Sequence, residues 1–317
     1  MLALLFPGQG SQEVGMGRDA YEASPAAREI FEAADGALGF PLSRLCFEGP
    51  EDELWRTENQ QPAILATSIA LLRALEENGP IAPAFVAGHS LGEYSALVAS
   101  GAVSFGDALR LVHARGRFMQ EAVPEGRGAM AAVIGVTCTQ VEECCRAAAA
   151  ETGQVVSPAN YNAPPQTVIA GDAAAVERAC ARAREEGAKR TVPLSVSAPF
   201  HCALMAPAAE KLSPEISGIR FADPDPPVVT NVEAVPNRDG SRIAALLERQ
   251  VTAPVRFVEM VQDLSERGVT RVLEVGPGRV LTGLVRRIDA EIERKNCSTF
   301  GEVEEASVFA VGRDPEK

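Results

Sequence analysis

Histidine is scarce in this sequence: only three occur among 317 residues, at positions 89, 113 and 201. They lie far apart in the chain, and neither an H-E-x-x-H pattern nor a G-x-x-x-x-G-K-[ST] phosphate loop is present. The sequence therefore predicts no metal centre. It also leaves only three candidates for a histidine that acts as a catalytic base.

Positive charge and long apolar runs are also in short supply. Lys and Arg number 30 against 43 Asp and Glu, a formal net charge of −13. A nucleic-acid-binding protein needs a basic stripe, so nucleic acid is not an expected partner. The longest apolar run, residues 63–75, is interrupted by Thr67, Ser68 and Arg73 and falls short of the ~20 residues that cross a bilayer. We expect a soluble protein that does not enter a membrane. The apolar first residues, which lack a basic leader, are expected to form a strand and not a signal peptide.

Paired cysteine motifs are absent as well. The seven cysteines form an odd set without C-x-x-C spacing, and Cys144 and Cys145 are adjacent, which rarely suits a disulfide. We expect reduced thiols and a cytoplasmic protein.

Apolar residues make up 46% of the chain, enough for one large core. In the first 120 residues, short strand patterns alternate with long helical patterns, which is typical of a parallel sheet covered by helices. Strands are expected at 2–6 and 84–87, and helices at 25–38 and 62–77. The alternation of strands and helices returns near the C-terminus, with a strand expected at 228–232, a helix around 256–267 and a strand at 271–275. The last 25 residues are polar, and we expect them to fray.

The middle of the chain has a different order of elements. We expect strands at 129–134, 155–161, 167–170 and 190–194, with helices at 140–150 and 174–186. This βαββαβ order is that of a ferredoxin-like fold. The prediction is an α/β protein in which a small ferredoxin-like subdomain, 127–195, is inserted into a large subdomain formed by 1–126 and 196–317.

A serine stands in a glycine turn at residues 88–92, Gly-His-Ser-Leu-Gly, between a strand pattern and a helical pattern. Such a G-x-S-x-G turn holds its serine in a strained conformation that requires small neighbours, and the serine oxygen projects above the sheet. Ser90 is therefore the candidate nucleophile. The backbone amide of Leu91, at the start of the helix, can stabilise an oxyanion at the same point. The alternative is a simple glycine turn.

The base of Ser90 follows by elimination among the three histidines. His89 is next to the nucleophile, and adjacent side chains diverge at such a turn. His113 is on the polar face of the helix expected at 107–122, so we expect it to be solvated. His201 remains, in a proline-containing loop just after the small subdomain. Cys202 beside it has no evident base and is expected to be a packed thiol.

The apolar stripe of the same helix carries a single arginine, Arg115. A buried guanidinium needs an anionic partner, because an unpaired buried charge is costly. The partner is either a carboxylate of the protein core or a carboxylate of the substrate, bound through two of the guanidinium nitrogens. Helical phase alone leaves both open. The glycine turn that contains Gln9 likewise could place backbone amides at the mouth of the sheet, or could be an ordinary connection.

Taken together, these motifs strongly resemble malonyl-CoA:acyl carrier protein transacylases, which load malonate in bacterial fatty acid synthesis and are related to the acyltransferase domains of polyketide synthases. The matching segments are F-P-G-Q-G-S-Q from Phe6, Q-Q-P-A from Gln60, G-H-S-L-G-E-Y from Gly88, Arg115 with Gly116, N-Y-N from Asn160, F-H-C-A-L-M from Phe200 and E-V-G-P-G from Glu274. They span nearly the whole chain. The resemblance implies an α/β-hydrolase-like large subdomain.

The resemblance also implies roles for individual residues. Ser90 would be the nucleophile, His201 the base, the Gln9 and Leu91 amides the oxyanion hole, and Arg115 the clamp for the malonyl carboxylate. A carbonyl at Gln250 would orient the histidine in place of an aspartate. Asn160 and Phe200 would contact the acyl group, and Phe200 would fill the space that an α-methyl group needs.

The expected partners are malonyl-CoA and acyl carrier protein, and the protein is expected to act as a monomer without a cofactor. Because the chain is acidic, such partners would have to meet a local basic patch. Two rivals remain. One is a serine hydrolase, which would have no need for Arg115 on the apolar stripe. The other is a catalytically silent subunit that binds carrier protein.

Overall fold

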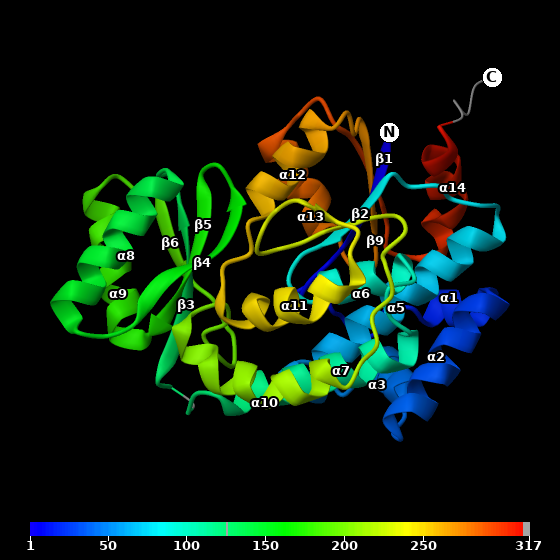
Figure 1. Ribbon diagram of the computed structural model, residues 1–317, viewed down its shortest axis with the longest axis horizontal. Coiled ribbons are helices and arrows are strands. Elements are labelled where there is room, and N and C mark those ends of the chain that lie inside the picture. Colours follow the sequence, from blue (N-terminus) through cyan, green and yellow to red (C-terminus); the bar gives the residue numbers. More distant parts are fainter. Residues whose placement is uncertain (125, 313–317) are drawn as a thin grey trace.

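The large sheet is the framework of the structure, a computed structural model that describes residues 1–124 and 126–312 (Figure 1). Its strand order is β10 (Glu293–Cys297), β9 (Arg271–Val275), β1 (Leu2–Phe6), β2 (Phe85–Gly88), β7 (Val228–Val229) and β8 (Pro236–Asn237). Neighbouring strands pair in parallel except β7 and β8, which are antiparallel. The predicted α/β class is confirmed. The predicted strand at 228–232 is shorter than expected.

Helices cover both faces of this sheet, so its central strand β1 is buried on both sides, as parallel strands usually are. Leu2, Leu4 and Phe6 belong to a core shared with α2, α5 and α7, whereas Ala3 and Leu5 belong to a core shared with α12 and α13. The helices of this part are α1 (Arg18–Ala23), α2 (Pro25–Leu38), α3 (Leu42–Glu48), α4 (Glu51–Leu54), α5 (Thr57–Glu77), α6 (Gly92–Ala99), α7 (Phe105–Glu121), α10 (Ala206–Ser217), α11 (Ile243–Thr252), α12 (Phe257–Glu266), α13 (Val280–Ile288) and α14 (Val303–Val311).

Helix α5 begins five residues before its predicted start at 62. Proline often marks the first turn of a helix because it lacks an N–H to donate. Here Pro62 is inside the helix, and the Thr57 N–H donates to Gln120 Oε1 of α7 at 3.1 Å. The extra turn matters for function, because it places Gln60 and Gln61 on a buried helix that reaches the serine turn.

The second sheet is antiparallel, in the order β4 (Val156–Ala163), β5 (Gln166–Asp172), β3 (Gly128–Ile134) and β6 (Arg190–Pro193). Helices α8 (Cys138–Thr152) and α9 (Ala173–Glu185) pack on it around a separate core. This confirms the predicted βαββαβ order. The green strands and helices form one end of the molecule, and β4 joins the large part through backbone hydrogen bonds to Val255 (Figure 1). The subdomain limits at 126/127 and 195/196 stay a prediction.

The C-terminal region corrects one expectation. Residues 293–312 of this polar stretch are ordered and do not fray. Strand β10 pairs in parallel with the outer edge of β9. Helix α14 buries Val303, Ala306 and Ala310 in the core that also contains Leu2, Leu4 and Phe6. Residues 313–317 lie outside the described part. All seven cysteines are free, as expected. None of the described helices has both the length and the apolar character needed to span a membrane.

Candidate active site

The turn that carries Ser90 has the strained geometry predicted for a nucleophile. Ser90 has φ +52°, in the left-handed region of backbone conformation that residues other than glycine rarely adopt. A Cβ at Gly88 would come within 2.0 Å of the Gly92 carbonyl, and one at Gly92 within 2.0 Å of the Phe6 oxygen. Both glycines are therefore required for the close approach of β1, β2 and α6. Asn231 holds the turn from the other side, accepting from the Ser90 N–H at 2.6 Å and donating to the Gly88 carbonyl at 2.7 Å.

His201 meets this serine. Its Nε2 is 2.7 Å from Ser90 Oγ, and its Nδ1 is 2.9 Å from the backbone oxygen of Gln250. A carbonyl only accepts, so Nδ1 carries the proton and Nε2 presents its lone pair to the serine hydroxyl. Burial, together with the nearby charge of Arg115, lowers the pKa of His201 to about 3. The imidazole is therefore neutral at pH 7, as a general base must be. The carbonyl does the orienting that an aspartate performs in many serine enzymes.

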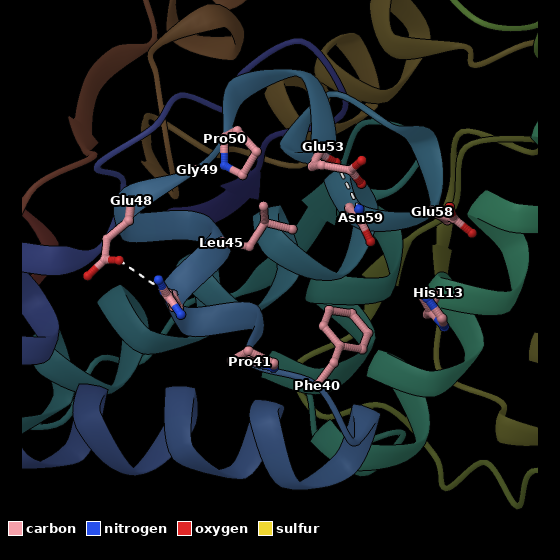
Figure 2. Close-up of a pocket in the computed structure, with 11 residues that line it drawn as sticks. Phe40, Pro41, Leu45, Glu48, Gly49, Pro50, Glu53, Glu58, Asn59 and His113 are labelled. Atoms are coloured by element: carbon pink, nitrogen blue, oxygen red, sulfur yellow. Dashed lines mark hydrogen bonds and ion pairs between the residues drawn. The ribbon is translucent and has the colours of Figure 1, made fainter.

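The other two histidines do not reach Ser90. His89 points away, and its Nε2 bonds Asn162 Oδ1 at 2.8 Å. His113 lines a separate surface depression of about 800 Å³, where its ring packs against Phe40 with centroids 5.6 Å apart (Figure 2). It is half-buried and so less solvated than expected, because Phe40, just beyond the end of α2, covers one side of its ring. Partial burial lowers the pKa of His113.

Arg115 is completely buried and lies directly beside the nucleophile. Its Nη2 donates to Ser90 Oγ at 3.1 Å and to Gln250 Oε1 at 2.9 Å, and its Nη1 donates to Gln61 Oε1 at 2.8 Å. Within residues 1–124 and 126–312, no carboxylate forms an ion pair with it. Neutral amides thus hold the guanidinium in position without cancelling its charge.

Three residues of this network were not identified from the sequence. Asn231 braces the serine turn, Gln61 holds Arg115, and the carboxylate of Glu93 accepts from Gln250 Nε2 at 2.6 Å and from the Asn231 N–H at 3.1 Å. Gln61 and Glu93 lie within the motifs Q-Q-P-A and G-H-S-L-G-E-Y. Asn231 follows the short strand β7, and no local signal marks it.

A cavity of about 480 Å³ opens onto Ser90 and His201 between the two sheets. Its lining includes Gln9, Asn160 and Phe200, which the sequence had suggested as contacts. The Leu91 side chain is buried beneath the turn. In the described part of the chain, the backbone N–H groups of Gln9 and Leu91 have no protein acceptor. They are therefore available to a ligand oxygen. No group of three or more His, Cys, Asp and Glu side chains in that part could hold a metal ion.

The chain matches the family of acyl transferase domains over residues 3–306. It is 52% identical to the malonyl CoA-acyl carrier protein transacylase of Escherichia coli K12 over 286 residues, which are 90% of this chain and 92% of that protein. The Bacillus subtilis 168 protein of the same name is 49% identical over 292 residues, 92% of each chain.

Solved structures agree with this. An acyl carrier protein S-malonyltransferase from Vibrio cholerae superposes with a TM-score of 0.93 at 45% identity, covering 96% of this chain and 99% of that one. A malonyl-transacylase solved in complex with a type II polyketide synthase acyl-carrier protein gives the same TM-score at 47% identity, covering 96% and 98%. The chain therefore belongs to the acyl transferase family and, within it, to the malonyl CoA-acyl carrier protein transacylases.

Proposed function

We propose that this protein transfers a malonyl group from malonyl-CoA to the phosphopantetheine thiol of acyl carrier protein, through a malonyl-Ser90 intermediate, for fatty acid or polyketide synthesis. The observation that carries the proposal is the buried guanidinium of Arg115, which forms no ion pair with described residues and lies 3.1 Å from the nucleophile. A positive charge at this point suits an acyl group that ends in a carboxylate. The structure offers no carboxylate of its own within ion-pair distance, among the described residues, to take that place.

The first half-reaction forms the acyl-enzyme. His201 Nε2 takes the Ser90 proton while the serine oxygen attacks the thioester carbonyl carbon. The carbonyl oxygen becomes an oxyanion, which the amides of Gln9 and Leu91 stabilise. The C–S bond then breaks, and the coenzyme A sulfur leaves with the proton from His201.

The second half-reaction reverses these steps with the carrier thiol. His201 takes the thiol proton, the sulfur attacks the Ser90 ester, and Ser90 regains a proton as the new thioester leaves. Arg115 holds the malonyl carboxylate throughout, so the ester carbonyl stays aligned between the two thiols. Asn160 and Phe200 line the cavity around the acyl group, with Phe200 in the space of an α-methyl substituent. Each step exchanges one acyl bond for another, and we propose that no cofactor takes part.

Three arginines on or next to helix α13 suggest where the phosphates of the two substrates sit. Helix α13 lines the cavity through Leu281 and Leu284. Arg279 precedes it, and Arg286 and Arg287 are in its last turn; all three are exposed and form no ion pair with described residues. Both coenzyme A and phosphopantetheine carry phosphate on the arm that enters the cavity. These arginines supply the local basic patch that an acidic protein needs for such partners.

Intact-protein mass spectrometry after brief exposure to malonyl-CoA tests the proposal. The wild-type protein should gain one malonyl group, which holo acyl carrier protein should then remove, and Ser90→Ala should gain none. An adduct that persists in Ser90→Ala would contradict the mechanism. Rapid release of free malonate without carrier protein would favour a hydrolase. No acyl-serine in the wild type would favour a silent carrier-binding subunit.

A further inference from the structure

Glu93 is a buried carboxylate near the nucleophile for which the transfer mechanism has no direct use. It lies in the first turn of α6, three residues after Ser90, and is only 2% exposed. One of its oxygens, Oε2, accepts from both Gln250 Nε2 and the Asn231 N–H, at 2.6 and 3.1 Å. Glu93 thus joins helix α11 and the loop after β7 to the serine turn.

The two ends of the Gln250 amide have opposite tasks. Its Nε2 donates to Glu93 and to the Ser90 carbonyl, and its Oε1 accepts from Arg115 Nη2. A guanidinium only donates, and a carboxylate only accepts. The amide can therefore satisfy both neighbours in one orientation alone. Without an acceptor at Glu93, that orientation loses its 2.6 Å hydrogen bond, and the support of Arg115 beside Ser90 weakens.

We propose that Glu93 is a positioning residue for acyl selectivity: by accepting from Gln250 Nε2, it keeps Gln250 Oε1 directed at Arg115 and so holds Arg115 ready for the malonyl carboxylate. This inference rests on the proposed function. It concerns hydrogen-bond geometry more than charge. Burial raises the pKa of Glu93 to about 7, and a neutral carboxyl keeps a carbonyl oxygen that can accept both bonds.

Two substitutions at Glu93 separate geometry from charge. Glu93→Gln keeps the length of the side chain and an acceptor oxygen but removes the charge. Glu93→Asp keeps the charge but withdraws the acceptor by one methylene. Glu93→Asp should lower the ratio of malonyl to acetyl transfer (kcat/KM for each CoA ester) by roughly tenfold, as expected for one lost hydrogen bond to a charged group. Glu93→Gln should keep the malonyl-to-acetyl ratio close to that of the wild type.

Glu274 offers a matched control. It is also a fully buried carboxylate, and it accepts from the Leu281 and Thr282 amides at the start of α13, with no hydrogen bond to Arg115 or Gln250. Glu274→Gln should lower the thermal midpoint without changing the malonyl-to-acetyl ratio. An equal fall of both transfer rates in Glu93→Asp, or a larger loss of selectivity in Glu93→Gln than in Glu93→Asp, would overturn the inference.

A double-mutant cycle tests whether Glu93 acts through Gln250. Gln250→Met removes the side-chain amide and keeps the backbone carbonyl that His201 uses. The double variant with Glu93→Asp should lose no more selectivity than Gln250→Met alone, because both substitutions remove the same chain of hydrogen bonds from Glu93 through Gln250 to Arg115. Additive effects would overturn the inference. A wild-type protein that transfers no malonyl group would instead refute the proposed function itself.

Discussion

Replacing Arg115 by alanine tests the central feature of the site, a buried guanidinium held by amides. In the proposed mechanism Arg115 binds the malonyl carboxylate through two guanidinium nitrogens, and Nη2 gives up its present hydrogen bond to Ser90 Oγ to do so. Removing one partner of such a buried pair costs about 3–5 kcal/mol. At 1.36 kcal/mol per factor of ten, malonyl transfer should fall by roughly two to almost four orders of magnitude in kcat/KM.

Acetyl transfer should suffer much less. An acetyl group has no carboxylate, so the only contact with a reacting group that the change removes is the 3.1 Å hydrogen bond from Arg115 to Ser90 Oγ. One hydrogen bond to a charged group contributes about 1.5–3 kcal/mol, roughly a ten- to hundredfold effect. At the midpoints of the two ranges, about 4 and 2.3 kcal/mol, the malonyl-to-acetyl ratio should therefore fall by roughly twentyfold. Arg115→Lys keeps the charge but cannot bind a carboxylate through two nitrogens, so its malonyl-to-acetyl ratio should lie between those of Arg115→Ala and the wild type.

The assay is the initial rate of transfer from labelled malonyl-CoA and acetyl-CoA to holo acyl carrier protein. Arg117→Ala is the control, because Arg117 is on the same helix α7 but exposed. Thermal melts would show that each variant is folded at the assay temperature. Equal losses for the two acyl groups in Arg115→Ala would refute the reasoning and make Arg115 a structural residue.

Three further predictions address the base, the turn and the acyl cavity. Because the pKa of His201 is lowered to about 3, the base stays neutral as the pH falls, and the acylation rate should be flat between about pH 5 and pH 8; a rate that falls with an apparent pKa near 6.5 in stopped-flow measurements would contradict this. Gly92→Ala should abolish acylation and lower the thermal midpoint, because its Cβ would lie 2.0 Å from the Phe6 oxygen, whereas Gly106→Ala, whose Cβ would be 3.6 Å from its nearest neighbour, should not destabilise the protein; equal melting of the two variants would disprove the steric argument. Phe200→Ser should raise the use of methylmalonyl-CoA relative to malonyl-CoA by about tenfold or more, measured as kcat/KM, and an unchanged ratio would remove Phe200 from the acyl pocket.

The chemistry of the turn could be predicted from the sequence because it is local. G-x-S-x-G between a strand and a helix already contains the glycines that the left-handed Ser90 and the close approach of Phe6 require. Helical phase placed Arg115 on the buried face of α7, since the period of a helix depends only on neighbouring residues. His201 followed by elimination, which succeeded because the chain has only three histidines.

Long-range contacts decided the rest. Sequence could not choose between a core carboxylate and a substrate as the partner of Arg115, because that depends on which side chains α5 and α11 bring to α7. The structure places two amides there, Gln61 and Gln250, and no ion-pairing carboxylate within the described residues. Likewise, Asn231 bonds Ser90 across 141 positions of sequence, and no local pattern records such a contact. The local motif thus predicted the candidate nucleophile, and periodicity predicted the fold class, whereas tertiary packing decided that Arg115 beside Ser90 forms no ion pair with the described residues.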